Sequence, residues 1–488
     1  MTIIIYFPKY GYASGRHPQI ANLEKYNVPG CLDYLFSACN KQNHQVKVID
    51  ANFSKLDIDF FLKSDLIFIS STTNSFTNTL NFIQELNGKN YKGNIFVGGS
   101  HPSLNLGKRD FLLPYFHNVH YIKTDKDILS DKGIFHWVTD TNRVCSNFSS
   151  SAIKDSFSET ELDLSWRKNT YSKEITGNTI IRNVLVTSIG CEKACSFCGN
   201  PAMYKLAFKS EKSIENTLIQ YKEAGIKRVY IPDMNFLSKP SHTKMVCSLL
   251  KKYGFEWSMQ TCIEDIKKNK NILSYLKEHG LIAFLVGVEN PVSKTLDKKV
   301  TLHDIESIIK ESRQSGLWII LSYIVGLNDV SLSADFKLLR HIRSIIDNKD
   351  IQPRFEAIDL QVNLFTPYRP LSDITYIAYN SYTKESLSKD LFNSSKGNNN
   401  DYILSDIPYE FWGLFPINIS NIESLTNKII LCDITYYLIY NNWLEKYLEI
   451  REKYISLLQS KYNEFSSYIP DFNKSVEMFG FDQKPTLK

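Results

Sequence analysis

Three of the nine cysteines of this 488-residue chain lie in one short stretch, TSIGCEKACSFCGNP (187–201), with the spacing Cys191-x3-Cys195-x2-Cys198. Thiols this close together serve a structural zinc site, a disulfide or an iron–sulfur cluster. A closed zinc site takes four ligands, often as two pairs, and no second pair of Cys or His closely follows the triplet. An iron–sulfur cluster normally takes four thiolates, so three would leave one iron open to a small molecule. The spacing favours the cluster and leaves the other two readings open.

Composition and charge indicate in which compartment the protein works and which classes of partner it is expected to have. The net charge is +5, from 57 basic and 52 acidic residues, and no basic run marks a nucleic-acid surface. No apolar run approaches the roughly 20 residues of a membrane helix, and the first residues, MTIIIYFPKYGY, resemble a strand more than a signal peptide. The other cysteines are isolated, mostly in apolar contexts. We therefore expect a cytoplasmic protein with no membrane or nucleic-acid partner, in which metal or redox chemistry is favoured over disulfides.

The elements that position the cysteines alternate regularly along residues 181–367. Helical patterns end at Gly225, Gly254, Gly280 and Gly316, and a strand pattern follows each glycine at once, as αβ loops require. The predicted strands are 181–188, 227–233, 255–261, 281–289, 317–327 and 357–367. Six strands are too few for a closed eight-stranded barrel. The pattern predicts a partial (β/α)6 barrel with the cysteines directly after its first strand.

A second alternating series precedes the barrel. Its predicted strands are 2–7, 45–50, 65–70, 94–99 and 118–123, with helical patterns between them. This order predicts an α/β domain with a doubly wound, Rossmann-like parallel sheet of the flavodoxin type. Ligands of such sheets bind beyond the carboxyl ends of the strands. The small or polar residues at those ends are Ser70, Ser71, Thr72, Gly98, Gly99 and His101.

Shifts in composition predict four segments. Residues 1–140 form the doubly wound domain, and residues 141–180, which include a Ser-rich stretch, form a linker. Residues 181–370 form the partial barrel. Residues 371–488 form a mainly helical C-terminal domain, because helical periodicity runs from about 421 to 468.

The CxxxCxxC triplet after the first strand of a six-stranded partial barrel resembles the radical SAM superfamily. The resemblance implies a four-iron four-sulfur cluster on the three cysteines, with S-adenosylmethionine (SAM) bound to the open iron. Motifs that resemble the family's SAM contacts are SFC, VYIPDMNF, WSMQTCIED, LVGVEN and YIVGL, and they imply contacts at Phe197, Asp233, Asn235, Gln260, Gly287, Glu289 and Gly326. Asp233 could instead cap the loop that follows it. Glu289 ends a very apolar strand, where an unpaired carboxylate would be costly.

The N-terminal sheet resembles the cobalamin-binding domain of one branch of that superfamily, on the stretches LIFISSTTNSF and IFVGGSHPSL. The resemblance implies that Ser70, Ser71, Thr72, Gly98, Gly99 and His101 line a slot for cobalamin. The DxHxxG signature of cobalt ligation by histidine is absent, so we expect no histidine ligand, and we interpret His17 and His101 as loop or neighbouring residues. The stretch YIKTDKDI stands where many relatives have an acidic glycine-rich turn.

These resemblances imply a cobalamin-dependent radical SAM enzyme. The 5′-deoxyadenosyl radical would remove hydrogen from a substrate, and methylcobalamin would give a methyl group to that unactivated carbon. One alternative keeps both cofactors for a rearrangement, cyclisation or oxidation, and an alternative of another class is a zinc-stabilised binding protein without catalysis. The expected partners are a small-molecule or peptide substrate and an electron donor such as flavodoxin or ferredoxin. The substrate and the catalytic residues stay open at this point.

Overall fold

The computed structural model describes most of the first two thirds of the chain and parts of the rest. The described residues are 1–9, 26–40, 44–72, 75–105, 116–122, 156–159, 161–171, 181–193, 195, 198, 206–269, 271–294, 296, 300–325, 327, 329–347, 358–364, 379–380, 385–386, 426, 429–430, 432–434, 444–461 and 471–478. Of the residues singled out above, His17, Phe197 and Gly326 lie outside them.

The N-terminal sheet has five parallel strands in the spatial order β3-β1-β4-β5-β6. The strands are β1 (Thr2–Phe7), β3 (Gln45–Asp50), β4 (Leu66–Ser70), β5 (Asn94–Gly98) and β6 (Val119–Tyr121). The helices are α1 (Gly30–Asn40), α2 (Ile58–Phe61), α3 (Phe76–Gly88) and α4 (Ser100–Asn105). Counted along the chain, this order is 2-1-3-4-5, so the predicted flavodoxin-type sheet is confirmed.

The second sheet has the order β14-β13-β12-β11-β10-β7-β2, and all its pairs are parallel. Its strands are β7 (Ile181–Val184), β10 (Arg228–Ile231), β11 (Glu256–Cys262), β12 (Leu281–Glu289), β13 (Trp318–Val325), β14 (Ile358–Leu364) and the short β2 (Tyr26–Asn27). The six predicted barrel strands are confirmed. The seventh, β2, comes from the N-terminal part of the chain and was not predicted.

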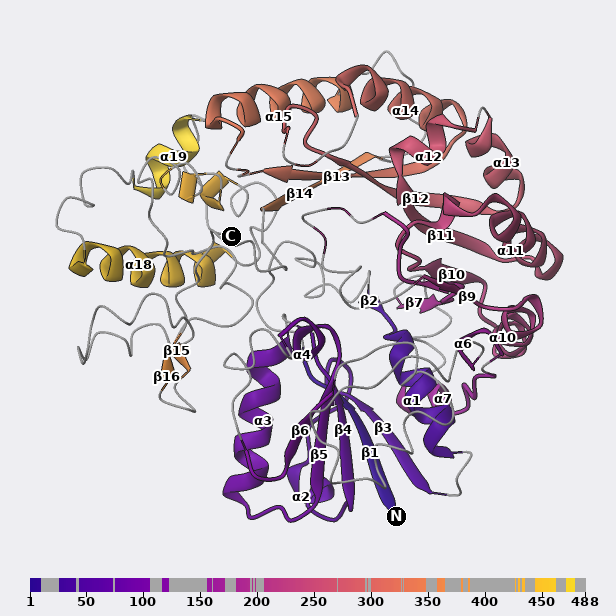
Figure 1. Ribbon diagram of the computed structural model, residues 1–488, viewed down its shortest axis with the longest axis vertical. Helices are drawn as coiled ribbons and strands as arrows, with labels where there is room; N and C mark the ends of the chain where they lie inside the picture. The colour runs from indigo at the N-terminus through magenta and orange to yellow at the C-terminus, as the bar shows by residue number, and fades with distance from the viewer. Residues whose placement is uncertain are drawn as a thin grey trace.

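Helices cover the outer, convex face of the barrel sheet (Figure 1). They are α10 (Glu211–Glu223), α11 (Pro240–Tyr253), α12 (Ile263–Lys267), α13 (Ile272–Glu278), α14 (Leu302–Gln314) and α15 (Leu332–Asp347), and a 3-10 turn (Phe236–Ser238) follows β10. The four predicted helix-ending glycines all have positive φ, between 62° and 94°. At Gly280 a Cβ would also lie 2.4 Å from the Phe255 carbonyl oxygen, so this turn needs glycine for space as well as for conformation.

The segment before the barrel is packed into the core along part of its length. It contains α6 (Ser156–Glu159) and α7 (Arg167–Thr170), and Phe157, Leu164, Trp166 and Tyr171 are all buried. Tyr171 donates its hydroxyl to Asp50 at the end of β3, 2.8 Å away. The range predicted as a linker therefore includes residues that fasten the first sheet to the barrel.

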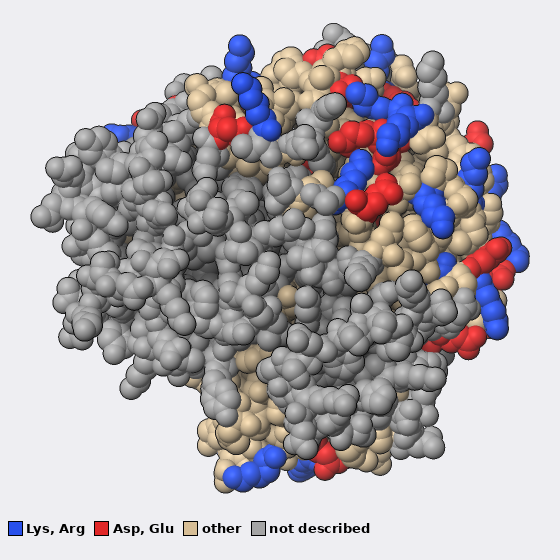
Figure 2. Space-filling model, in the orientation of Figure 1, with Lys and Arg blue, Asp and Glu red and all other residues tan. Residues whose placement is uncertain are grey.

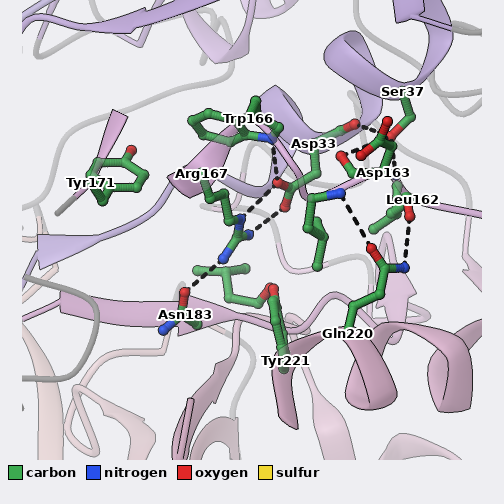
Figure 3. Close-up of polar contacts among 12 residues, drawn as sticks. Asp33, Ser37, Leu162, Asp163, Trp166, Arg167, Tyr171, Asn183, Gln220 and Tyr221 are labelled. Carbon is green, nitrogen blue, oxygen red and sulfur yellow. Dashed lines mark hydrogen bonds and ion pairs between the residues drawn. The ribbon is translucent and has the colours of Figure 1, made fainter. Parts of the chain in front are cut away.

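A buried ion pair in this segment joins the two sheets (Figure 3). Arg167 donates from Nε to Asp33 Oδ1 in α1 at 2.9 Å and from Nη2 to Oδ2 at 2.5 Å. Its Nη1 donates to Asn183 Oδ1 in β7 at 2.7 Å, and Trp166 Nε1 donates to Asp33 Oδ1 at 3.1 Å. Burial lowers and the Asp33 carboxylate raises the pKa of Arg167, with a net rise, so the guanidinium stays charged. One side chain thus fixes α1 against the first barrel strand.

The C-terminal part is described over α18 (Leu444–Lys461), α19 (Phe472–Met478), a few helical residues between 426 and 434, and two antiparallel two-residue strands, β15 (Tyr379–Asn380) and β16 (Glu385–Ser386). A second buried ion pair lies here, because Arg451 donates to both oxygens of Asp433 at 2.7 and 2.8 Å. Among the described residues, no helix is both long enough and apolar enough to cross a membrane.

Candidate functional site

The cysteine loop leaves the barrel at the carboxyl end of β7. Two short antiparallel strands, β8 (Ser188–Ile189) and β9 (Ala207–Phe208), pair with each other and flank the cysteine triplet in the sequence. Cys191, Cys195 and Cys198 are half-buried and form no disulfide. The backbone N of Cys198 donates to the Cys195 carbonyl at 3.1 Å, so these two cysteines lie close together. Burial raises the pKa of the Cys191 thiol in the metal-free protein.

The placement of the thiols bears on the choice between zinc and a cluster. In the part of the chain that the structure describes, no three Cys, His, Asp or Glu side chains converge where they could hold one metal ion. A structural zinc site needs such convergence on a single ion. A four-iron cluster does not, because each thiolate binds a different iron. Three half-buried thiols on one loop are therefore compatible with a cluster in which each binds its own iron.

Asp233 lies just beyond β10 and is 1% exposed. Its Oδ1 accepts from the backbone N of Thr187 at 2.9 Å, and its Oδ2 accepts from the hydroxyls of Thr187 and Ser188 at 2.5 and 2.7 Å. Burial raises the pKa of Asp233, and these donors oppose the rise. His242 Nε2 lies 3.0 Å from Thr187 Oγ1, and since that hydroxyl donates to Asp233, its oxygen accepts from the imidazole. This group braces the chain where the cysteine loop begins.

Asn235 and Asp265 form a second brace at the other side of the cysteine loop. Asn235 Nδ2 donates to Asp265 Oδ2 at 2.7 Å, and its Oδ1 accepts from Thr261 Oγ1 at 2.9 Å and from the backbone N of Cys262 at 3.2 Å. Lys193, inside the cysteine triplet, places Nζ 3.2 Å from Asp265 Oδ2. Burial raises the pKa of Asp265, but the donors from Asn235 and from Lys193 and Lys268 outweigh it and leave a lowered pKa.

Gln260 and Gly287 lie on the inner side of the barrel sheet. Along β11 buried residues alternate with half-buried ones, and Gln260 and Cys262 belong to the half-buried series. Helices cover the other face, so this series faces the interior. Gln260 Nε2 donates to the Pro232 carbonyl at 3.0 Å. Gly287 pairs with Cys262 in the sheet register, which puts the glycine and the thiol side by side.

Glu289 ends β12 in an unusual backbone conformation. Its φ is +54°, one of three positive values among the described non-glycine residues, and the register against β13 shifts between Gly287 and Glu289. A left-handed conformation costs a non-glycine residue about 1–3 kcal/mol. A bulge of this kind redirects a side chain at the end of a strand. The half-buried Glu289 is therefore placed at the carboxyl edge of the sheet by a local distortion of the backbone.

The carboxyl edge of the N-terminal sheet is built from hydroxyl groups. Ser71 Oγ lies 2.7 Å from Thr79 Oγ1, and Ser75 Oγ accepts from the backbone N of Thr72 at 3.0 Å. Ser70 Oγ lies 3.1 Å from the Cys31 sulfur. Ser70 and Ser71 are buried, whereas Thr72 is partly exposed. Of these predicted cobalamin contacts, Thr72 is the one with an accessible side chain.

Gly99 and His101 also make contacts within the protein that the fold requires. Gly99 has φ +104°, and a Cβ there would lie 2.2 Å from the Ser71 carbonyl oxygen, so the glycine is needed by the neighbouring loop. His101 is 3% exposed, and its ring stacks on Phe76 with centroids 3.9 Å apart. Burial lowers the pKa of His101 to about 3. A bound cofactor could meet the partly exposed backbone of Gly98 and Gly99, beside Thr72.

Sequence reasoning missed several residues that the structure brings to the cysteine loop. They are Thr187, Ser188, Lys193, His242, Cys262 and Asp265. Two signals could have found some of them. Lys193 lies between two of the cysteines, and Asp265 follows the carboxyl end of a barrel strand, where parallel sheets place functional side chains.

Charged side chains on the face drawn in Figure 2 are mixed in sign over the described residues, without a broad basic area. Ion pairs of the described residues, such as the exposed Arg228 with Glu256, also join side chains of opposite charge.

Comparisons with known proteins give one family and one fold. The family model of the radical SAM superfamily matches residues 185–339, which hold the cysteine triplet and strands β10 to β13. A structure of the radical SAM methyltransferase TsrM from Kitasatospora setae with cobalamin and a [4Fe-4S] cluster bound is 12% identical, with a TM-score of 0.56 and 87% of each chain covered. Another, with a tryptophan substrate and the SAM analogue aza-SAM, is 13% identical, with a TM-score of 0.51 and 70% and 71% covered. At these identities the likeness shows the fold alone. The search of curated proteins found no significant match.

Proposed function

Residues 185–339 form a radical SAM domain, and from this premise we propose that the chain is a radical SAM enzyme that uses cobalamin to transfer a methyl group to an unactivated carbon. The observation that carries the proposal is the set of three half-buried cysteines, none of them in a disulfide, beyond the first barrel strand. Its cofactors would be a four-iron four-sulfur cluster, SAM and cobalamin.

The chain's own residues would divide the work between the two carboxyl edges. Cys191, Cys195 and Cys198 would hold the cluster, and Gln260 and Glu289 would meet SAM at the barrel mouth. When bound, these cofactors supply a carbon-centred radical and a methyl carrier, while the protein supplies position and the exclusion of water. Thr72 and the backbone of Gly98 and Gly99 would contact cobalamin.

The methyl-transfer part is supported by the pairing of two folds in one chain. A flavodoxin-type sheet precedes the radical SAM barrel, and this arrangement is similar to that of TsrM over 87% of both chains. A carbon radical cannot attack the methyl group of a sulfonium as a nucleophile would, so a metal-held methyl group gives this chemistry a route. The substrate is proposed only as a small molecule or peptide, and flavodoxin or ferredoxin as the electron donor.

Anaerobic reconstitution tests the proposal without knowledge of the substrate. The protein is loaded with iron, sulfide and cobalamin, then given a strong reductant and SAM labelled in its methyl group. We expect an iron–sulfur absorption band, release of 5′-deoxyadenosine, and label in the protein-bound corrinoid.

Each product answers a separate part of the proposal. A colourless protein with stoichiometric zinc would support the binding-protein alternative and end the enzyme proposal. Release of 5′-deoxyadenosine with no label in the corrinoid would overturn methyl transfer and favour a rearrangement, cyclisation or oxidation.

A further inference from the structure

The cysteine loop is held at two points, one by Asp233 and one by Asp265, which is hydrogen-bonded to Asn235. The family resemblance assigns Asp233 and Asn235 to SAM. At its base, Asp233 accepts three hydrogen bonds from Thr187 and Ser188, at 2.5 to 2.9 Å. Within the loop, Lys193 pairs with Asp265, whose same oxygen, Oδ2, also accepts from Asn235. We propose that Asp233 and Asn235 are positioning residues of the cysteine loop rather than contacts of SAM. The inference rests on the proposed function only in taking this loop as the cluster site.

Burial separates these two residues from the other predicted SAM contacts. Asp233 and Asn235 are 1% and 3% exposed, whereas Gln260 and Glu289 are half-buried. Gln260 and Glu289 are therefore more accessible to a ligand than Asp233 and Asn235. To contact Asp233 or Asn235, a ligand would have to enter a site where each side chain is almost completely buried and hydrogen-bonded to the protein.

The base of the loop depends on the acceptor character of Asp233. Thr187 presents both a backbone N–H and a hydroxyl to this carboxylate, and Ser188 adds a second hydroxyl. An amide in its place would turn an NH2 group toward one of these donors and leave a buried donor unsatisfied. The chain would then lose the hold on residues 187–188, three positions before the first cysteine.

Asn235 does not contact the cysteine loop through Lys193 directly but acts through Asp265, the carboxylate that pairs with Lys193. Asn235 bridges Asp265 and the end of β11, where it accepts from Thr261 and from the backbone of Cys262. It therefore orients the carboxylate that Lys193 contacts. Lys193 also lies 3.5 Å from Glu264 Oε2, so the amino-terminal turn of α12 presents two carboxylates to the loop.

The test compares iron retention with SAM affinity in matched variants. Asp233→Asn and Asn235→Ala should retain cluster iron about 10- to 100-fold less well against a chelator, the usual effect of removing a group that orients metal ligands. SAM affinity, measured by equilibrium dialysis on the loaded fraction, should stay within about twofold. Lys193→Met should behave like Asn235→Ala, and Lys193→Arg should restore iron retention because it keeps the ion pair. The EPR spectrum of the reduced cluster should broaden in the three weakened variants.

Gln260→Ala serves as the matched control at the same edge of the sheet. It should lower SAM affinity and leave iron retention unchanged. If Asp233→Asn and Asn235→Ala keep full iron and instead weaken SAM binding as Gln260→Ala does, the two residues are SAM contacts and the inference is wrong.

Hydrogen exchange in the metal-free protein keeps this inference separate from the proposed function. The Thr187 amide donates directly to Asp233, so its exchange should accelerate in Asp233→Asn and not in Gln260→Ala. Amides of α11, at Val246–Leu250, report that the barrel is still folded. If the unmodified protein binds no iron, the proposed function fails, while unchanged Thr187 exchange in Asp233→Asn would still overturn the positioning role.

Discussion

The two parallel sheets of this chain present carboxyl edges that differ in chemistry. At the N-terminal sheet, the edge between β4 and β5 is made of hydroxyl groups and glycines, and Gly99 lets two loops meet at backbone distance. At the barrel, the edge carries carboxylates and an amide, and Asp233 and Asp265 each hold a part of the cysteine loop. At both edges, side chains form hydrogen bonds or ion pairs that connect neighbouring loops. The two edges differ in the chemical groups that they present: neutral hydroxyls and glycines at the first, carboxylates and an amide at the second.

This difference matches the ligands that the two edges are proposed to take. A carboxylate in a buried site orients cations and hydrogen-bond donors, which suits a loop that must hold a metal cluster in one geometry. A neutral edge of small residues leaves room for a large ligand that is met mainly by backbone groups. The edges thus use the same topology for two different tasks, and each task can be disrupted alone.

The largest expected effect comes from removing a thiol at the barrel edge. Cys198→Ala should lose most of the cluster iron after anaerobic reconstitution, because one iron would lack its ligand. Iron and sulfide analysis measures this directly. Corrinoid binding at the other edge should stay unchanged.

Cys247→Ala is the control for this variant, because Cys247 is a fully buried thiol of α11 within the hydrophobic core. It should keep its iron and lose only a small amount of stability. Equal iron loss in both variants would contradict the assignment of the triplet as the cluster site.

The ion pair of Arg167 with Asp33 joins the two sheets, because it holds α1 of the N-terminal part against β7 of the barrel. Arg167→Met leaves the Asp33 carboxylate buried without its charged partner, which should cost about 3–5 kcal/mol of unfolding free energy. Denaturant unfolding measures the loss, and hydrogen exchange should rise in α1 and β7. The double variant Asp33→Leu with Arg167→Met should recover much of it, because it removes the buried charge as well.

Arg451→Met is a matched control with the same chemistry, since Arg451 and Asp433 form a buried pair in the C-terminal part. It should cost a similar amount of stability without faster exchange in α1 or β7. Faster exchange there in both variants would mean that Arg167 has no special part in joining the two sheets.

Sequence patterns predicted the main strands of both sheets, but not the short strand β2 or the side-chain contacts that join the two sheets. Alternation of apolar residues and the glycines at 225, 254, 280 and 316 predicted both sheets, because these signals act locally. The role of Arg167 had no local signal, since its partner Asp33 lies 134 positions away. Similarly, Asp233 was found as a polar residue at a strand end, but only the structure showed that Thr187 and Ser188 already bind it.

A smaller effect is expected from adding one methyl group at the N-terminal edge. Gly99→Ala puts a Cβ about 2.2 Å from the Ser71 carbonyl oxygen at a φ of +104°, which should cost about 2–4 kcal/mol and abolish corrinoid retention. Gly225→Ala is matched to it, because Gly225 also has positive φ, +75°, but has no atom within 4 Å of its Cβ position. It should cost about 1 kcal/mol and leave corrinoid binding unchanged. Equal costs would mean that the close approach at Gly99 has no role.

The smallest effect concerns the neutral histidine of the N-terminal edge. Burial lowers the pKa of His101 to about 3, whereas the unfolded chain has a histidine pKa near 6.5. Below about pH 6.5 the unfolded state therefore binds a proton that the folded state does not, so stability falls as the pH falls towards 3. At pH 5 this difference is about 2 kcal/mol, and above pH 7 it vanishes. His101→Phe should keep the ring stacked near Phe76 and make the denaturant midpoint of the cofactor-free protein less sensitive to pH between 7 and 5.

At the barrel edge, burial and then the nearby Lys239 lower the pKa of His242 to about 4. His242→Phe should flatten the same pH dependence, and if neither variant does so, the two edges do not hold neutral histidines.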